Sequence, residues 1–544
     1  MMFNRKKKEI KRLKASFGKL KEDYRDFEII DKYFRNSYNS GAFQVLSDRT
    51  CNDLDFEELF GFLDRTTSRV GQQYLYKKLR TISDDSKNTV RNEAIISKLT
   101  EDADLRVKVQ RELVKLADFN AYYISSLFQE EHIQPPKYFF IFRVLSISAI
   151  LLLMLLPFNP QLIFVLLGVF VINLGIHFWN KKNLLMYLGS IPQLLNLNRV
   201  AYSLHKEVLL KKIDPELEKS IKIINQVRNR MLFFQLEGKL QGDLAVIFWG
   251  IFELVKTLFL LEPLLLFGVL KRLTTKRKEI ENVFSFVGEV DVLVSIASLR
   301  KGLGSFCTPI INQRDNRIVA EQIYHPLIPN CVPNNISVSN KSILLTGSNM
   351  SGKTTFIRAV GINLITGLTI NTCFAKSLTL PVLRLFSAIR ISDDLMNDKS
   401  YYFEEVLTIK EMLEKSSDGK PNLFLLDEIF KGTNTVERIA AGKATLSHLS
   451  KNGNIVFVST HDIELTDMLA EEYELYHFSE IISNETIDFD FKLKEGKLKN
   501  RNALRILEIN DYPDSVISEA IQISKELDKQ MRKDGSSISE KLSD

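Results

Sequence analysis

One eight-residue segment constrains the fold of this chain more than any other feature. Residues 347–354 read Gly-Ser-Asn-Met-Ser-Gly-Lys-Thr, the pattern of a glycine, four residues and then Gly-Lys-Thr. The apolar run 343–346 before it predicts a strand, and the segment 355–365 after it predicts a helix. Glycines in such a loop let backbone N–H groups close around phosphate oxygens, and the helix N-terminus adds partial positive charge. We therefore predict an α/β domain built around a phosphate-binding loop.

The residues of this loop have distinct predicted roles. Lys353 is expected to reach the outer phosphates of ATP and to act in catalysis, and Thr354 to offer its hydroxyl to Mg²⁺. ATP and Mg²⁺ are thus the predicted cofactors. The residues predicted to bind the phosphates are Gly347, Ser348, Asn349, Met350, Ser351, Gly352, Lys353, Thr354 and Thr355.

Two further predicted strands end in polar side chains. The apolar run 423–426 delivers Asp427 to the metal, and Glu428 then lies where it can polarise the attacking water. The run 455–458 leads to His461, which we interpret as a catalytic sensor of the γ-phosphate. Alone, the acidic pair could be a surface feature and the histidine structural. Their order after the phosphate loop favours the catalytic interpretation.

Charge and cysteine content add weaker constraints. The net charge of +6 is compatible with nucleic acid or anionic lipid but specifies neither. The four cysteines have no CxxC spacing, which argues against a zinc site or a disulfide framework and fits a reducing compartment.

Two apolar runs set the middle of the chain apart. Residues 138–158 contain Arg143 as their only charge, and residues 160–179 contain no Asp, Glu, Lys or Arg. Each run is about 20 residues long, enough to cross a hydrocarbon layer of about 30 Å. The turn Pro-Phe-Asn-Pro at 157–160 joins them. We predict a transmembrane hairpin over 135–180; a helical hairpin buried in a soluble core is the alternative.

The flanking charges predict the orientation of this hairpin. Lys137 and Arg143 lie at its start, Lys181 and Lys182 follow it, and the turn carries no charge. Cationic residues favour the cytoplasmic ends of membrane spans. We therefore expect a multi-pass protein of the inner or plasma membrane, with its N-terminus and its ATPase domain in the cytoplasm.

The first fifty residues are basic and helix-favouring. Ile10, Leu13, Phe17 and Leu20 recur at spacings of three and four, as in an amphipathic helix. A helix packed on its own domain and a helix that contacts anionic lipid or phosphates both fit this pattern.

A third apolar stretch, 244–270, differs from the hairpin. It contains Glu253, Lys256, Glu262 and Pro263, and charges inside a hydrocarbon layer are costly. We predict one long helix that is largely buried or interfacial, with a third membrane contact as the alternative.

Several segments in the last part of the chain have sequences typical of one known family. They are 346–355 (Thr-Gly-Ser-Asn-Met-Ser-Gly-Lys-Thr-Thr), 390–395 (Arg-Ile-Ser-Asp-Asp-Leu) with Lys399, Ser400 and 403–405, 427–433 (Asp-Glu-Ile-Phe-Lys-Gly-Thr), 459–465 (Ser-Thr-His-Asp-Ile-Glu-Leu) and 324–327 (Tyr-His-Pro-Leu). In motif order and wording they resemble the ATPase domain of the MutS family of DNA mismatch repair proteins. Weaker likeness to the family's helical core begins near residue 50, at 63–66 (Leu-Asp-Arg-Thr).

This resemblance implies a mechanism that needs two subunits. ATPase domains of the family pair so that each signature segment faces the nucleotide of the other subunit, which assigns Ser400 to the partner's γ-phosphate. The resemblance also implies a homodimer formed through the ATPase domains, DNA as a partner, and His325 near the nucleotide.

The sequence departs from the family pattern in several places. Ser348 and Ser351 stand where relatives often have Pro and Gly, and both are small. The wording Lys-Ser-Tyr-Tyr-Phe at 399–403 replaces the usual Ser-Thr-Phe. A mismatch-reading domain is not evident before the core, and the apolar runs lie where a DNA clamp would sit.

Two hypotheses about function stay open. The first is a membrane-tethered ATPase of the MutS family, related to DNA repair, that couples ATP hydrolysis to binding of mismatched or structured DNA. The alternative is a membrane ATPase that has lost DNA binding and acts on a protein or membrane partner. An ABC transporter is disfavoured because two spans are too few for a path and an LSGGQ-type signature is absent.

The predicted fold class is α plus α/β. A long helical core and lever region with a transmembrane helical hairpin precedes a P-loop (ABC-like) α/β ATPase domain. The predicted segments are a basic helical segment (1–50), a helical core (51–134), the hairpin (135–180), a helical lever region (181–308), the ATPase domain (309–519) and a polar tail (520–544).

Overall fold

The residues of this chain form two compact units in a computed structural model. Unit 1 comprises Met1–Val45 and Phe60–Gly304, and unit 2 comprises Leu46–Leu59 and Ser305–Asp544. The residues described are 2–39, 41–83, 88–237, 243–312, 316–339, 341–348, 350–390, 401–482, 487–498, 507–508 and 512–526.

The short segment Leu46–Leu59 belongs to unit 2, although most of it was assigned to the helical core from the sequence. It contains α3 (Asp48–Asp53) and the start of α4 (Phe56–Leu63). Helical periodicity shows that a helix buries one face, but it does not show which neighbour covers that face. The predicted boundary near residue 309 lies close to the second junction between the units.

The regular elements in the described residues of unit 1 are helices, apart from one small pair of strands. Its longest buried element is α16 (Arg277–Gly302), in which nearly every residue from Val283 to Arg300 is buried. Its other elements are α1 (Met2–Ser16), α2 (Phe27–Arg35), β1 (Gln44–Val45), α5 (Arg69–Arg80), β2 (Thr81–Ile82), α6 (Thr89–Glu101), α7 (Ala103–Leu113), η2 (Val114–Leu116), η3 (Phe119–Ile124), α8 (Ser126–Gln129), α9 (Phe139–Leu155), α10 (Leu162–His205), α11 (Val208–Lys211), α12 (Leu217–Asn225), α13 (Arg228–Glu237), α14 (Asp243–Leu258), α15 (Leu261–Leu273) and η4 (Thr274–Lys276).

A buried aspartate joins the start of α5 to α16. Asp291 accepts hydrogen bonds from the backbone N–H groups of Thr67 and Ser68, at 2.9 and 2.7 Å, and from the Ser68 hydroxyl at 2.6 Å. Ser68 in turn caps α5 by accepting from the N–H of Gly71. Burial raises the pKa of Asp291 to about 6.

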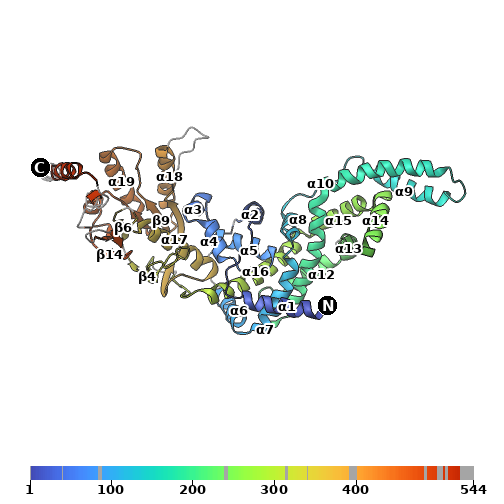
Figure 1. The fold of residues 1–544 in the computed structure, drawn as a ribbon, viewed down its shortest axis with the longest axis horizontal. Coiled ribbons are helices and arrows are strands. Elements are labelled where there is room, and N and C mark those ends of the chain that lie inside the picture. The colour runs from blue at the N-terminus through green and yellow to red at the C-terminus, as the bar shows by residue number, and fades with distance from the viewer. Residues whose placement is uncertain are drawn as a thin grey trace. The chain divides into compact units, whose positions relative to one another are not determined.

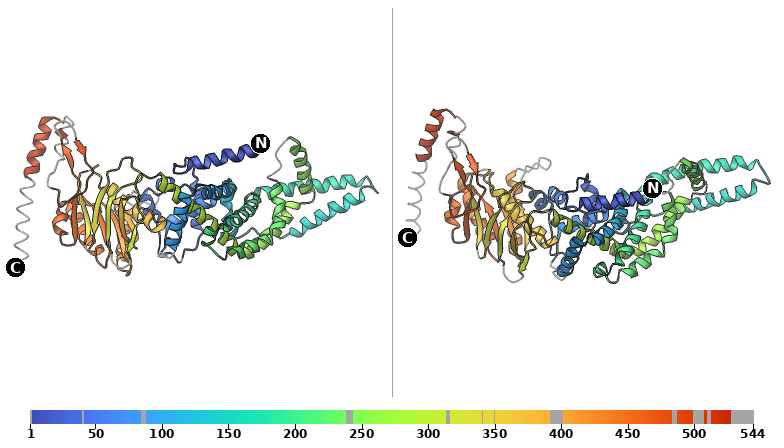
Figure 2. Two further views of the ribbon diagram at one scale, coloured as in Figure 1. Left: turned by 90° about the horizontal axis from the view of Figure 1, so that it is seen from below. Right: turned by 60° about the horizontal axis from the view of Figure 1, so that its bottom comes forward.

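The helix α9 and the first half of α10 run side by side as a hairpin (Figures 1 and 2). Many of their apolar side chains are exposed, among them Phe164 at 75% and Met154 at 66%. The window Leu162–Trp179 is long and apolar enough to cross a membrane, and only 17% of it is buried. The hairpin is therefore not buried in the core of this unit, and its crossing of a membrane stays a prediction.

The prediction of one long helix over 244–270 is wrong. The chain instead forms α14 and α15, because Leu260 adopts a left-handed conformation (φ 47°). Pro263 lies in the first turn of α15, where a proline costs no hydrogen bond. A second stretch that meets the length and composition of a membrane span is Leu261–Gly302, and 89% of its most apolar window of 18 residues is buried in unit 1.

The basic N-terminal helix α1 packs against its own unit. Leu13 is buried, and Lys14 Nζ lies 3.1 Å from Asp104 Oδ1. The guanidinium of Arg106 lies 3.6 Å from the centre of the Phe17 ring. These contacts agree with the first of the two interpretations of this segment.

Unit 2 contains a six-stranded sheet in the order β14-β11-β6-β10-β9-β8. All neighbours are parallel except β14, which is antiparallel to β11. The strands are β6 (Ser342–Thr346), β8 (Arg384–Ala388), β9 (Asn422–Asp427), β10 (Ile455–Ser459), β11 (Tyr473–His477) and β14 (Lys494–Glu495). A four-stranded sheet, β3-β7-β4-β5, comprises β3 (Ile310–Asn312), β4 (Ile318–Ile323), β5 (Asn334–Val338) and β7 (Ser377–Pro381), and β12 (Glu480–Ile482) pairs with β13 (Ile487–Phe489).

Helices cover both faces of the large sheet. Alternate residues such as Leu344, Phe424 and Val458 pack on one face with side chains of α18 (Tyr401–Ser416), α19 (Thr435–Leu449) and α20 (Glu464–Met468). The other face is covered by α17 (Lys353–Ile370), where Gly361 lies so close that an added Cβ would be 2.6 Å from Leu425. Because β6, β10 and β9 are parallel neighbours, their carboxyl ends meet at one edge of the sheet.

Candidate active site

The phosphate loop joins β6 to α17 and depends on its glycines. Gly347 has φ 150°, and a Cβ there would lie 2.7 Å from the carbonyl oxygen of Phe478. Gly352 has φ 107°, a conformation that L side chains rarely adopt. Ser351 is not in this left-handed region, so a serine fits without backbone strain. Met350 is 84% exposed, and Asn349 lies outside the described residues.

The side chain of Lys353 is folded into this loop. It is 5% exposed, and its Nζ donates to the carbonyl oxygens of Gly347 at 2.8 Å and Ser348 at 2.9 Å. Burial lowers the pKa of Lys353, while the carboxylates of Glu428 and Asp427 raise it. The ammonium group therefore already lies among the loop residues predicted to hold phosphate.

The structure brings together the two predicted metal-binding residues. Thr354 Oγ1 donates to Asp427 Oδ2 at 2.7 Å. The hydroxyl of Ser459, at the end of β10, also donates to Asp427. Ser459 belongs to a recognised motif, but nothing in that motif indicates that its hydroxyl reaches this carboxylate.

A hydroxyl and a carboxylate oxygen at this position fit Mg²⁺. Both are hard donors, and Mg²⁺ usually completes its octahedral shell with waters and substrate phosphates. Within the described ranges, no cluster of three or more His, Cys, Asp or Glu side chains could hold a metal ion by itself. A magnesium ion beside Thr354 and Asp427 would thus need phosphate and water as further ligands.

Glu428 and His461 are in direct contact. His461 Nε2 lies 2.8 Å from Glu428 Oε1, and Lys431 Nζ lies 2.5 Å from Glu428 Oε2. The hydrogen bond with His461 is the main cause that lowers the pKa of Glu428 to about 2, and Lys431 contributes, while burial opposes the shift. The carboxylate is therefore ionised at neutral pH, as a base that activates water must be.

Neighbouring groups hold the chain around these two residues. The N–H of Glu428 donates to the carbonyl of Ser459 at 2.9 Å, which ties the end of β9 to β10. Next to His461, Asp462 accepts two hydrogen bonds from Arg438 of α19, at 2.6 and 2.9 Å. The Arg438–Asp462 pair was not predicted, because the two residues are distant in sequence.

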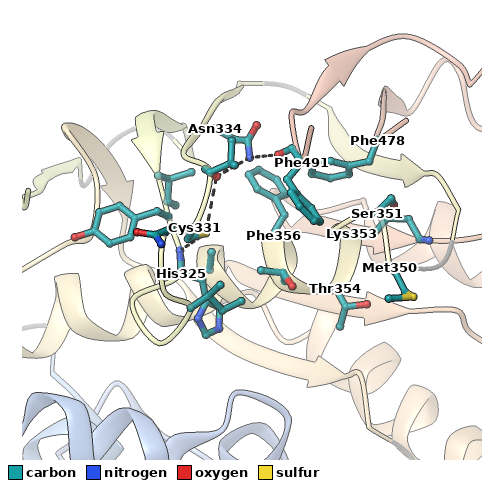
Figure 3. A pocket seen from close by; sticks show the side chains of 18 of the residues that line it. His325, Cys331, Asn334, Met350, Ser351, Lys353, Thr354, Phe356, Phe478 and Phe491 are labelled. Atoms are coloured by element: carbon teal, nitrogen blue, oxygen red, sulfur yellow. Dashed lines mark hydrogen bonds between the residues drawn. The ribbon is translucent and has the colours of Figure 1, made fainter. Parts of the chain in front are cut away.

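A cavity of about 310 Å³ adjoins the phosphate loop (Figure 3). Phe356, Phe478 and Phe491 line one side of it, and His325 and Cys331 line another. The sequence identified only His325 among these five. Aromatic residues scattered over separate loops leave no local pattern that could have revealed the others.

The walls of this cavity are held in place by hydrogen bonds. Asn334 donates to the carbonyl of Phe491 at 3.0 Å and accepts from the N–H of Leu493 at 2.7 Å. His325 is 4% exposed, and its Nδ1 accepts from the N–H of Leu327 at 3.3 Å. Burial, followed by the charge of Arg358, lowers the pKa of His325 to about 4, so this imidazole is neutral at pH 7.

The predicted trans residue, Ser400, lies outside the described residues. The chain is described up to Arg390 and again from residue 401. After this gap, Glu405 of α18 is buried and accepts a hydrogen bond from the N–H of Phe430, in the loop that follows Glu428. The Phe-Glu-Glu segment thus lies beside the loop that follows Glu428.

Comparison with known proteins agrees with this arrangement. Residues 343–528 match the family described as MutS domain V. The DNA mismatch repair protein MutS of Aquifex pyrophilus is 30% identical over 262 residues, which is 46% of this chain and 30% of that protein. The MutS proteins of Listeria welshimeri (29% over 287 residues) and Petrotoga mobilis (31% over 273 residues) each match about half of this chain and 33% of their own length.

The similarity is thus concentrated in one part of each protein, and the chain spans about a third of the length of these relatives. That part contains the phosphate loop, the strand that ends at Asp427 and the strand that leads to His461. Residues 343–528 of this chain are therefore a domain similar to domain V of MutS proteins.

Proposed function

We propose that this chain is a Mg²⁺-dependent ATPase that hydrolyses ATP to ADP and phosphate. One observation carries the proposal: Lys353, Thr354, Asp427, Glu428 and His461 converge at one edge of a parallel sheet, next to a cavity. The named relatives are DNA mismatch repair proteins, and the family supplies the expectation of ATP as substrate.

Each of these residues has a role in the proposed reaction. Lys353 and the loop N–H groups bind the phosphates, and the ammonium group leaves the loop carbonyls to do so. Glu428 takes a proton from the attacking water. The water oxygen forms a bond to the γ-phosphorus, while the bond between that phosphorus and the β–γ bridging oxygen breaks and ADP leaves. Bound at Thr354 and Asp427, Mg²⁺ would neutralise phosphate charge. His461 positions Glu428 and senses the γ-phosphate.

The cavity beside the loop is proposed to hold the nucleoside. Its aromatic side chains Phe356, Phe478 and Phe491 offer stacking surfaces, and Cys331 and the neutral His325 add little charge. An orphan hydroxyl supports a ligand at the loop itself: Ser351 Oγ is buried without a hydrogen-bond partner among the described residues.

Two variants test this assignment. Lys353→Ala should abolish turnover, and Glu428→Gln should still bind ATP but hydrolyse it slowly, because the amide cannot accept the proton. Steady-state phosphate release and binding of a fluorescent ATP analogue separate the two effects. Normal hydrolysis by Lys353→Ala would overturn the assignment of the loop.

We propose further that the ATPase acts as a homodimer and is coupled to binding of mismatched or structured DNA. This rests on the family relationship and on the cationic surface of α1, where Lys6, Lys7 and Lys8 are exposed. ATPase rates with homoduplex, mismatched and branched DNA at two salt concentrations test it. Stimulation that fades with salt supports DNA coupling, and indifference to every DNA contradicts it.

The alternative is a membrane ATPase that acts on a protein or membrane partner. Both candidate functions include a membrane tether, and we propose the exposed apolar hairpin of α9 and α10 as that tether. The proposed location is the inner or plasma membrane, with both ends of the hairpin in the cytoplasm. Retention in the membrane fraction after alkaline carbonate extraction tests the tether, and release into the supernatant contradicts it.

A further inference from the structure

In the described end of α14, apolar side chains are exposed and charged side chains are buried, which is the reverse of a helix on a wet surface. Ile251, Leu254 and Val255 are 55%, 57% and 38% exposed, whereas Lys256 is fully buried and the side chain of Glu253 is 16% exposed. A helix on a wet surface turns its charges outward and its apolar residues inward. Here the apolar side chains face outward, which fits apolar surroundings.

The buried charges of this region are matched with one another. Lys256 Nζ lies 3.0 Å from Glu253 Oε1 and 3.4 Å from Glu262 Oε2, across the turn to α15. His177 Nε2 of α10 lies 3.7 Å from Glu253 Oε2. Ionisable groups that pair inside a helical bundle do not need water, which is how charges are tolerated at membrane depth.

A backbone carbonyl at the end of α14 also has a hydrogen-bond partner within the protein. Asn173 of α10 is fully buried, and its Nδ2 donates to the carbonyl oxygen of Leu258 at 2.7 Å. The last carbonyls of a helix lack partners within the helix, and in hydrocarbon each unsatisfied group costs several kcal/mol. Here the Asn173 side chain, which belongs to the predicted membrane hairpin, serves one of these carbonyls in place of water.

A groove between α10 and α14 continues the apolar surface of the hairpin. It encloses about 300 Å³ beside residues of α10 that belong to the window Leu162–Trp179. On the other side, α15 packs on α9 through the rings of Phe267 and Phe139, whose centres are 5.1 Å apart. The described residues that line the groove are all apolar: Ile163, Leu166, Leu167, Phe170, Leu254, Val255 and Leu258.

The two helices are short enough to enter a hydrocarbon layer and return to the same side. With 16 and 13 residues, α14 and α15 are about 24 and 20 Å long, less than a hydrocarbon layer of about 30 Å. The pair ends at Lys271 and Arg272, which are exposed. Cationic side chains of this kind suit the membrane surface.

We propose that α14 and α15 form a re-entrant helical pair whose turn lies in the hydrocarbon layer, with lipid acyl chains in the groove against α10. The proposal rests on the membrane tether proposed for α9 and α10. It also accounts for the charges in residues 244–270. Lys256 pairs with Glu253 and Glu262 inside the helical bundle, near the turn between α14 and α15.

Tryptophan fluorescence can test this, because the chain has only Trp179 and Trp249. With both changed to Phe, single reporters are introduced into the full chain as Leu254→Trp, Phe164→Trp and Val208→Trp. Phe164 reports the hairpin, and Val208 of α11, which is 80% exposed, is the control outside the apolar region. Each variant is reconstituted into phosphatidylcholine vesicles with or without bromine on the acyl chains, and its ATPase rate is compared with that of the parent.

The expected result is loss of emission in brominated vesicles for Leu254→Trp and Phe164→Trp, with none for Val208→Trp. Quenching of Phe164→Trp without Leu254→Trp would overturn the re-entrant pair and leave the tether intact. Quenching of neither would overturn both. If Leu254→Trp does not fold, Val255→Trp on the same exposed face takes its place.

Discussion

In the phosphate loop, two positions have backbone conformations that favour glycine, and a third position, Ser351, has a side chain without a hydrogen-bond partner in the described part of the chain. Gly347 and Gly352 have conformations that favour glycine, and at Gly347 a neighbouring carbonyl leaves no room for a Cβ. Ser351 is free of that demand, although relatives often carry glycine there. Its hydroxyl is buried and has no hydrogen-bond partner in the described part of the chain.

We predict that this hydroxyl binds a phosphate oxygen. Ser351→Ala should then weaken ATP binding about fivefold, equivalent to a hydrogen bond of about 1 kcal/mol, with little change in kcat. Titration with a fluorescent ATP analogue and steady-state kinetics measure the two quantities. An unchanged affinity would mean that the hydroxyl faces away from the nucleotide.

The buried His325 predicts an acid-sensitive unit 2. Its pKa is about 4 in the fold and about 6.5 in an unfolded chain, so between these values only the unfolded chain binds the proton. The free energy of unfolding should therefore fall as pH falls through this window, by up to about 3–4 kcal/mol for the whole difference in pKa. Hydrogen exchange of β6 and β10 amides at pH 7 and pH 4.5 reports this opening.

A matched pair of variants isolates that effect. His325→Gln should remove most of the difference between the two pH values, because no proton is gained on unfolding. His448→Gln, at an exposed histidine of α19, should leave it unchanged. The same pH difference in parent and His325→Gln would contradict the assignment.

At the scale of elements, the segment Leu46–Leu59 is a part of unit 2 that sequence motifs do not mark. Asp53 of α3 is fully buried and accepts from the Ser387 hydroxyl at 2.6 Å and from the N–H groups of Ile389 and Arg390, at 3.1 and 2.7 Å. It thereby fixes the chain where β8 ends. Asp55 adds ion pairs with Arg358 of α17 and with Arg390.

Removing the Asp53 carboxylate should loosen β8. Asp53→Ala leaves three donors without their acceptor, which should cost about 2–3 kcal/mol. Faster hydrogen exchange of the β8 amides would show it. Glu57→Ala, at an exposed position of α4, is the control and should have no effect. Equal protection in both variants would mean that the fold compensates for the lost contacts.

Elements differ in how well their sequence predicts them. The strands β6, β9 and β10 were predicted because each is an apolar run that ends in a motif, and parallel pairing then brings the motifs together. The break at Leu260 was missed, since a leucine carries no signal for a left-handed conformation. The contact between His461 and Glu428 depends on two loops, so strand patterns could not predict it.

At the scale of the whole molecule, periodicity identifies helices but not their neighbours. The sequence predicts most residues of Leu46–Leu59 as part of the helical core, whereas they belong to unit 2. In the same way, length and apolarity alone do not separate the buried Leu261–Gly302 from the exposed Leu162–Trp179. Exposure distinguishes the two, and it depends on the tertiary structure.

The proposed homodimer makes a prediction that involves the whole assembly. If Ser400 completes the site of the other subunit, Lys353→Ala and Ser400→Ala should each be inactive alone. In a heterodimer of the two variants, the intact phosphate loop of one chain meets the intact Ser400 of the other, which restores one of two sites. An equimolar mixture that exchanges subunits freely should regain about a quarter of the parent turnover, because about half of the dimers are mixed.

Phosphate release by the mixture, before and after subunit exchange, measures this recovery. A mixture of Lys353→Ala with Glu428→Gln is the control. Both changes damage the site that their own chain contributes, so each site of that heterodimer stays impaired and no recovery is expected. Full activity of Ser400→Ala alone would instead place the whole reaction within one chain, and the dimer would then serve the partner rather than the chemistry.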